Sequence, residues 1–122
     1  MKGQITLEYL VLAVVLLSIL SLSIYALFQI KENAEHTQEF IIFSSDVNSI
    51  DSNIKNVCSL GSGNSRILEI STSIDLSYEE GGLIFIFGNY SIPKKYSCGI
   101  EGVDSIADFI SIENIDGSIE IH

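Results

Sequence analysis

The sequence predicts an α+β fold in which one long N-terminal helix is followed by a small antiparallel β domain. Two observations lead to this prediction. Residues 4–60 contain neither glycine nor proline, the two residues that most reliably interrupt a helix. From residue 66 onward, apolar residues recur with the two-residue period of a strand. We therefore expect four segments: a short N-terminal stretch (1–3), an apolar helical segment (4–30), an amphipathic continuation of the same helix (31–60) and a globular antiparallel β domain (61–122).

The apolar segment is long enough to cross a membrane. Residues 9–28 read YLVLAVVLLSILSLSIYALF, a run without any charged residue. As a helix, a run of this length spans about 30 Å, the thickness of the hydrocarbon core of a bilayer. It is longer than the apolar part of an ordinary secretory signal, and no A-x-A-like cleavage site follows it. We therefore expect a transmembrane helix that stays on the mature protein, with its N-terminus in the cytoplasm and the acidic remainder outside.

The amphipathic continuation is expected to cover the β domain. Its apolar residues recur at spacings of three and four, which indicates one stripe along a helix. Gly61-Ser62-Gly63-Asn64 supplies a stop signal, so the whole helix would be about 85 Å long. A domain of about sixty residues is marginal alone, and we expect the stripe to complete its core. The stripe consists of Phe40, Phe43, Val47, Ile50, Ile54 and Val57.

The β domain is expected to contain four to six antiparallel strands. Strict alternation over residues 68–78 predicts one half-buried strand, and residues 79–82 (EEGG) predict a turn. Residues 83–87 (LIFIF) are apolar on both faces, as in a central strand covered by a helix. Residues 93–95 (PKK) predict another turn. The sequence NIDG at 114–117, between alternating isoleucines, predicts a hairpin.

The two cysteines, Cys58 and Cys98, both follow the apolar segment. If this part of the chain is outside the cell, a single disulfide is favoured, and it would tie the end of the helix to a strand. A bridge of this span stabilises a fold by about 4 kcal/mol in a chain-entropy model. The alternative is a pair of buried free thiols.

The charges and the titratable residues exclude several classes of function. With 16 acidic and 6 basic residues, the net charge is −10, which disfavours binding to nucleic acid or to an anionic membrane surface. His36 and His122 lack the spacing of metal ligands, and two cysteines are too few for structural zinc. The sequence therefore predicts no enzyme, no metal and no cofactor.

The triplet Asn89-Tyr90-Ser91 is a possible N-glycosylation site on an exported domain.

Polar residues at or inside the apolar run have two possible roles. Glu8 lies directly before the run; it either has a function there or reaches the hydrated interface. Ser18, Ser21 and Ser23 lie inside the run. They either allow close approach of a neighbouring helix or bond back to their own helix.

The opening stretch, residues 2–12 (KGQITLEYLVL), resembles the class III signal peptide of archaeal type IV pilins, especially those of methanogens. Precursors of that family carry a short basic leader that ends in glycine, and a membrane-embedded prepilin peptidase cuts after this glycine. A Gln-x-Ser-x-Glu-x-x-x-Leu pattern and a hydrophobic helix follow the cut. Here Gln4, Glu8 and Leu12 fall on the pattern, and Thr6 stands where serine is usual.

The resemblance implies both a processing site and a function. Cleavage between Gly3 and Gln4 would remove residues 1–3, including the leader charge of Lys2, and Glu8 would offset the new ammonium group at Gln4. The trimmed chain would leave the lipid, polymerise with other pilin subunits on a membrane assembly platform, and form an extracellular adhesive filament. Two alternatives stay open: a minor pilin, and a non-polymerising, membrane-anchored surface protein that binds a ligand through its β domain.

Overall fold

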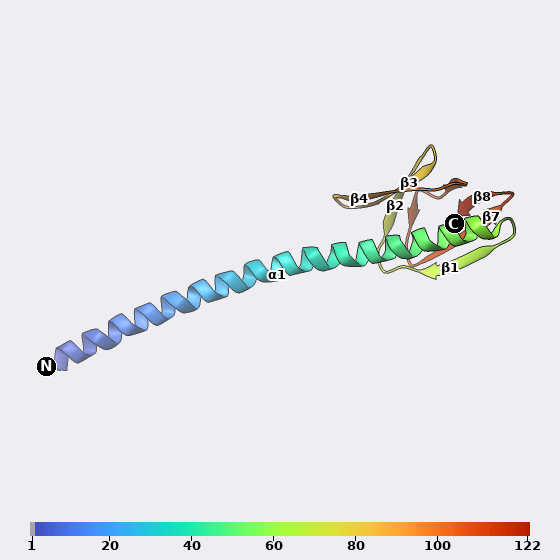
Figure 1. Ribbon diagram of the computed structural model, residues 1–122. Helices are drawn as coiled ribbons and strands as arrows, with labels where there is room; N and C mark the ends of the chain where they lie inside the picture. The colour runs from blue at the N-terminus through green and yellow to red at the C-terminus, as the bar shows by residue number, and fades with distance from the viewer. Residues whose placement is uncertain (1) are drawn as a thin grey trace. The chain divides into compact units, whose positions relative to one another are not determined.

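The computed structural model describes residues 2–122 and confirms the α+β fold class (Figure 1). By its internal contacts the chain divides into an N-terminal unit that extends to Gln38 and a C-terminal unit, Glu39–His122. The helix begins at Lys2, two residues before the expected start, and has 59 residues. The elements are α1 (Lys2–Leu60), β1 (Ser65–Glu69), β2 (Ile74–Glu79), β3 (Gly82–Phe87), β4 (Tyr90–Lys95), β5 (Gly99–Gly102), β6 (Ser105–Ile106), β7 (Phe109–Ile115) and β8 (Ser118–Ile121).

The N-terminal unit is helical throughout its described residues. Within residues 2–122, α1 is the one helix long and apolar enough to cross a membrane, and none of its most apolar window is buried. Leu10 and Leu22, for example, are 63% and 69% exposed. A helix satisfies its backbone hydrogen bonds internally, which is what a segment needs in lipid. The structure thus contains a long apolar N-terminal helix of the kind that serves as a membrane anchor or a signal.

The C-terminal unit contains two four-stranded sheets, ordered β1-β7-β8-β5 and β4-β3-β2-β6. The expectation of four to six antiparallel strands was wrong in number and in one orientation, because β5 pairs with β8 in parallel. Parallel neighbours need a long connection. Here residues 103–117, which contain β6 and β7, provide it.

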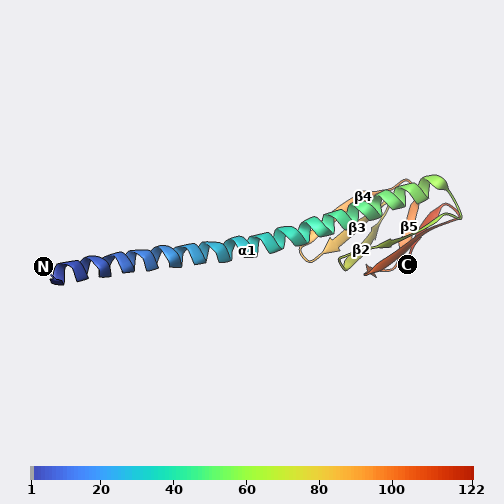
Figure 2. The ribbon, with the colours of Figure 1, turned by 90° about the horizontal axis from the view of Figure 1, so that it is seen from below.

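The apolar stripe of α1 forms one side of a single core, as predicted. Figures 1 and 2 show the last turns of α1, in green, running along the strands of this unit. Phe40, at the start of the stripe, remains 40% exposed, and its ring lies 5.0 Å from that of Tyr90 between centroids. The fully buried members of the stripe are Phe43, Val47, Ile50, Ile54 and Val57. Ile70, which follows β1, belongs to the same cluster, and both sheets contribute to it through Ile74, Leu76, Leu83, Phe85, Ile106, Ile110, Ile112, Ile119 and Ile121.

The single strand predicted over residues 68–78 is instead two strands in different sheets. β1 ends at Glu69 and β2 begins at Ile74, and residues 70–73 cross from one sheet to the other. The crossing is fixed by Asp46 of α1, whose Oδ2 accepts hydrogen bonds from the backbone N–H groups of Ser71 and Thr72 at 2.9 and 3.0 Å. A side chain distant in sequence therefore ends the first strand.

The turn predicted at residues 93–95 was also wrong, because Pro93 lies within β4. Proline donates no hydrogen bond to a ladder and is tolerated on edge strands. β4 is such an edge, with β3 as its sole neighbour in the sheet. The other local predictions hold: β3 lies between β2 and β4, and the β7–β8 hairpin turns at Asp116 and Gly117. Both of these residues have positive φ (53° and 90°), as a type I′ turn requires.

Candidate processing and assembly site

The Gly3–Gln4 peptide bond lies in the first turn of α1. Gly3 does not have positive φ, and a Cβ added to it would meet no atom within 4 Å. Neither the backbone conformation nor the packing of the described residues therefore requires glycine here.

The remaining motif residues, Thr6, Glu8 and Leu12, lie on the same helix. The Thr6 Oγ1 donates a hydrogen bond of 2.9 Å to the carbonyl oxygen of Lys2, so this bond spans the predicted cleavage site. Glu8 and Leu12 are four residues apart and share one face of α1. The Glu8 carboxylate is exposed and has no ion-pair partner within residues 2–122. It is available to a group outside these residues.

The three serines of the charge-free run bond back to their own helix. The hydroxyl groups of Ser18, Ser21 and Ser23 donate to carbonyl oxygens four residues earlier, at 2.8, 2.9 and 2.9 Å. The structure therefore shows the second of the two expected roles, a hydrogen bond from each serine to its own helix. A hydroxyl that is already bonded costs less in an apolar environment than a free one. The run thus presents an essentially apolar surface along its length.

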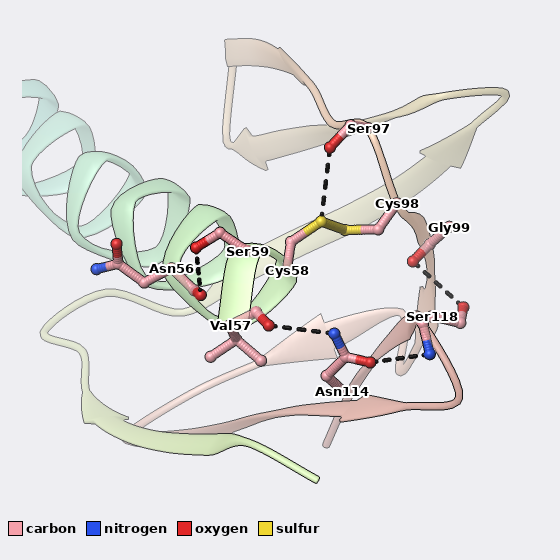
Figure 3. Close-up of a disulfide and its surroundings, with 10 residues drawn as sticks. Asn56, Val57, Cys58, Ser59, Ser97, Cys98, Gly99, Asn114 and Ser118 are labelled. Carbon is pink, nitrogen blue, oxygen red and sulfur yellow. Dashed lines mark hydrogen bonds between the residues drawn. A yellow bond between two sulfur atoms is a disulfide. The ribbon is translucent and has the colours of Figure 1, made fainter. Parts of the chain in front are cut away.

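The end of α1 is fastened to the rest of the C-terminal unit at two points (Figure 3). Cys58 forms a disulfide with Cys98, and their Cα atoms are 6.2 Å apart. Cys98 lies in the connection between β4 and β5, not on a strand as expected. On the neighbouring side, the buried Asn114 donates from Nδ2 to the carbonyl oxygen of Val57 at 3.1 Å. Its Oδ1 accepts a hydrogen bond from the N–H of Gly117 at 3.0 Å. One asparagine therefore joins the helix end to the turn of the β7–β8 hairpin.

Beside the disulfide lies a cavity of about 320 Å³, lined by Lys55, Cys58, Ser59, Lys95, Tyr96 and Ser97. Asp51 is almost buried next to it, and its Oδ2 lies 2.8 Å from the Nζ of Lys55 and 4.0 Å from that of Lys94. Burial, and then the proximity of the Asp51 carboxylate, raise the pKa of Tyr96. No motif in the sequence pointed to this cluster, because its members come from two segments about forty residues apart.

The remaining predicted positions are exposed or isolated. Asn89 is exposed at the tip of the β3–β4 turn, where a glycosylating enzyme has access. His36 lies on α1. The Nε2 of His122 lies 3.7 Å from the Oε1 of Glu120. Within residues 2–122 no group of three histidine, cysteine, aspartate or glutamate side chains is placed to hold a metal.

No family model, curated protein or solved structure matches the chain. The function must therefore be argued from its own residues.

Proposed function

We propose that this chain is a structural subunit of an archaeal type IV-like adhesive pilus. It is made as a membrane-inserted precursor, trimmed by a prepilin peptidase between Gly3 and Gln4, and polymerised through its N-terminal helix into a cell-surface filament. The observation that carries the proposal is the position of the Gly3–Leu12 motif, immediately before a charge-free run of exposed helix.

The exposed run needs an apolar environment. Burial of one large aliphatic side chain is worth about 1.5–3 kcal/mol, and about a dozen such side chains are exposed between residues 9 and 28. Lipid supplies this environment before assembly. Equivalent helices of other copies supply it afterwards, and the transfer costs little because lipid tails and leucine-rich helices are similarly apolar. Identical contacts repeated by a screw operation produce an open fibre.

The cleavage site fits this route. A cut before the apolar helix, rather than after it, keeps the helix on the mature chain. The new ammonium group at Gln4 would then lie one helical turn from Glu8. A carboxylate next to this charge lowers the cost of placing both in an apolar bundle. Nothing in the described fold requires glycine at position 3. Recognition by the peptidase would explain why glycine stands there.

The proposal is tested by the N-terminal residue of the native protein, read by mass spectrometry. We expect Gln4 as the first residue in purified filaments, and we expect the Gly3→Leu variant to remain untrimmed in the membrane fraction. The conservative change Leu7→Ile serves as a control for expression and should be trimmed normally. Normal filaments from Gly3→Leu would overturn the proposal. A native chain that keeps Lys2 and forms no fibres would instead identify a non-polymerising surface protein.

A further inference from the structure

We propose that a basic patch next to the disulfide, formed by Lys55, Lys94 and Lys95, binds the acidic face of α1 of a neighbouring copy of this chain. The acidic face consists of Glu32, Glu35 and Glu39. This inference rests on the proposed function, because it concerns how copies meet in a filament. It adds a polar contact to the burial of apolar helices, which by itself does not select a register.

The patch concentrates positive charge in an acidic chain. It contains three of the six basic residues, whereas the sequence has sixteen acidic ones. The patch draws on two elements, with Lys55 on α1 and the two other lysines at the end of β4. Within residues 2–122, Asp51 is the one carboxylate that pairs with these lysines within 4 Å. Lys94 is half-buried beside this carboxylate, whereas the exposed Lys95 has no such partner among the described residues, so the patch keeps unpaired positive charge.

The patch surrounds a recess that an acidic side chain can enter. Lys55 and Lys95 both line the cavity of about 320 Å³ described above. The Ser59 hydroxyl already donates to the carbonyl oxygen of Asn56 at 2.9 Å, and the Tyr96 hydroxyl is buried, so the ammonium groups are the main donors at the recess. This volume is many times the ~30 Å³ that a water molecule occupies in the liquid. A carboxylate accepts hydrogen bonds from ammonium groups. The recess therefore suits a carboxylate better than an apolar or cationic group.

The acidic face has the complementary geometry. Glu32, Glu35 and Glu39 are separated by three and four residues, so they lie on one face of α1 along about 10 Å. All three are exposed. Lys31 approaches Glu35 at 3.7 Å, but an exposed pair of this kind contributes little. Within residues 2–122, Glu32 and Glu39 take part in no ion pair.

A second copy is the occupant that the charges favour. Packing the apolar helices of many copies together brings their acidic faces close, and the full-length chain carries a net charge of −10. Screening reduces this repulsion beyond about 8 Å, so the opposing charge must make direct contact. The patch provides such a charge once per subunit. Charge complementarity of this kind mainly fixes register and partner choice.

Cross-linking of full-length filaments tests the contact directly. Filaments assembled from a mixture of unlabelled and ¹⁵N-labelled subunits are treated with a carbodiimide, which joins a lysine amine to a carboxylate in contact with it. We expect mixed-isotope peptide pairs that join Lys94 or Lys95 to Glu32, Glu35 or Glu39. Filaments in which these lysines join only other carboxylates of this chain, only another acidic protein, or nothing would overturn the inference while leaving the proposed function intact.

Charge reversal tests whether the contact matters. Lys95 has no ion-pair partner within the described residues, so Lys95→Glu should leave the unfolding temperature unchanged and lower filament yield about tenfold. Combination with Glu32→Lys and Glu39→Lys should restore the yield. Arg66→Glu, a charge reversal on β1, is the matched control and should assemble normally.

If all variants are trimmed at Gln4 and assemble like the wild type, the inference fails. If the wild type itself forms no filaments, the proposed function fails.

Discussion

Asp46 on α1 holds Thr72 in the crossover between the two sheets. The Asp46 Oδ2 accepts hydrogen bonds from the backbone N–H of Thr72 at 3.0 Å and from its Oγ1 at 2.8 Å. The N–H of Ser71 donates to the same oxygen at 2.9 Å. Three donors thus converge on one carboxylate oxygen, and the helix determines where the chain leaves β1 for β2.

We therefore expect Asp46→Ala to destabilise the C-terminal unit by about 2–3 kcal/mol, because hydrogen bonds to a charged acceptor contribute more than neutral ones. Urea unfolding of the full chain in detergent, followed by tyrosine fluorescence, measures this loss. Asp75→Ala, at an exposed position of β2, should change the free energy of unfolding by less than about 0.5 kcal/mol. Equal effects of the two variants would show that the crossover does not depend on Asp46.

The same crossover shows how far the sequence predicts this fold. Ile70 and Ile74 are both buried and an even number of residues apart. Alternation therefore continues through the crossover, and a two-residue period cannot reveal it. The helical stripe and the type I′ hairpin were predictable because their signals are local. The parallel β5–β8 pair and the position of Pro93 in an edge strand depend on which strands meet, and no local pattern encodes that.

The candidate site divides in the same way. Gly3, Gln4 and Glu8 belong to one short motif and could be recognised from the sequence. The basic patch joins Lys55 to Lys94 and Lys95 across about forty residues, and only the folded chain brings them together. In the sequence alone, residues 93–95 (PKK) predicted only a turn.

Asn114 provides a second stability prediction. It is 1% exposed, and its Nδ2 donates to the carbonyl oxygen of Val57. Asn114→Asp would replace this donor with an acceptor facing a carbonyl, so we expect a loss of about 3 kcal/mol at neutral pH. The urea midpoint measures the loss. Asn56→Asp, an exposed change on the same helix end, should cost less than about 1 kcal/mol. A wild-type midpoint for Asn114→Asp would remove this residue from the fastening of α1.

The disulfide should be the strongest single constraint on the C-terminal unit. It closes a loop with a sequence separation of 40 residues, for which the chain-entropy model gives about 4 kcal/mol. We expect the Cys58→Ser/Cys98→Ser variant to lose roughly this amount in urea unfolding, and the reduced wild type to match it. Reductant should not affect the double variant. A loss below about 1 kcal/mol would mean that Asn114 and the core hold the helix end without the bridge.

Tyr78 gives the fold a sensitivity to alkaline pH. Its hydroxyl donates to the carbonyl oxygen of Val103 at 2.7 Å. Burial, and then the charge of Asp104, raise its pKa to about 12. In the unfolded chain tyrosine ionises near pH 10. The unfolded state therefore loses this proton first, so the contribution of Tyr78 is complete below about pH 10 and declines as the pH rises to about 12.

Unfolding temperatures of wild type and Tyr78→Phe between pH 8 and 12 check this dependence. Phenylalanine does not ionise, so the variant should start less stable but fall less steeply above pH 10. Tyr25→Phe, outside the C-terminal unit, should follow the wild-type curve. Parallel curves for wild type and Tyr78→Phe would contradict the prediction.

Glu8 should control assembly without affecting the β domain. The Glu8→Leu change removes the carboxylate that would offset the ammonium group of Gln4, and an unpaired charge in an apolar bundle is costly. We expect slower assembly and fewer filaments, with the urea midpoint of the C-terminal unit unchanged. Glu8→Gln keeps the shape and loses the charge, so it should share the defect if charge is the cause.

Glu80→Leu, in the exposed β2–β3 turn, is the matched control for Glu8→Leu. Filament counts by electron microscopy, with the N-terminal residue read by mass spectrometry, separate an assembly defect from a trimming defect. Wild-type filament numbers from Glu8→Leu would show that this carboxylate only reaches the membrane interface.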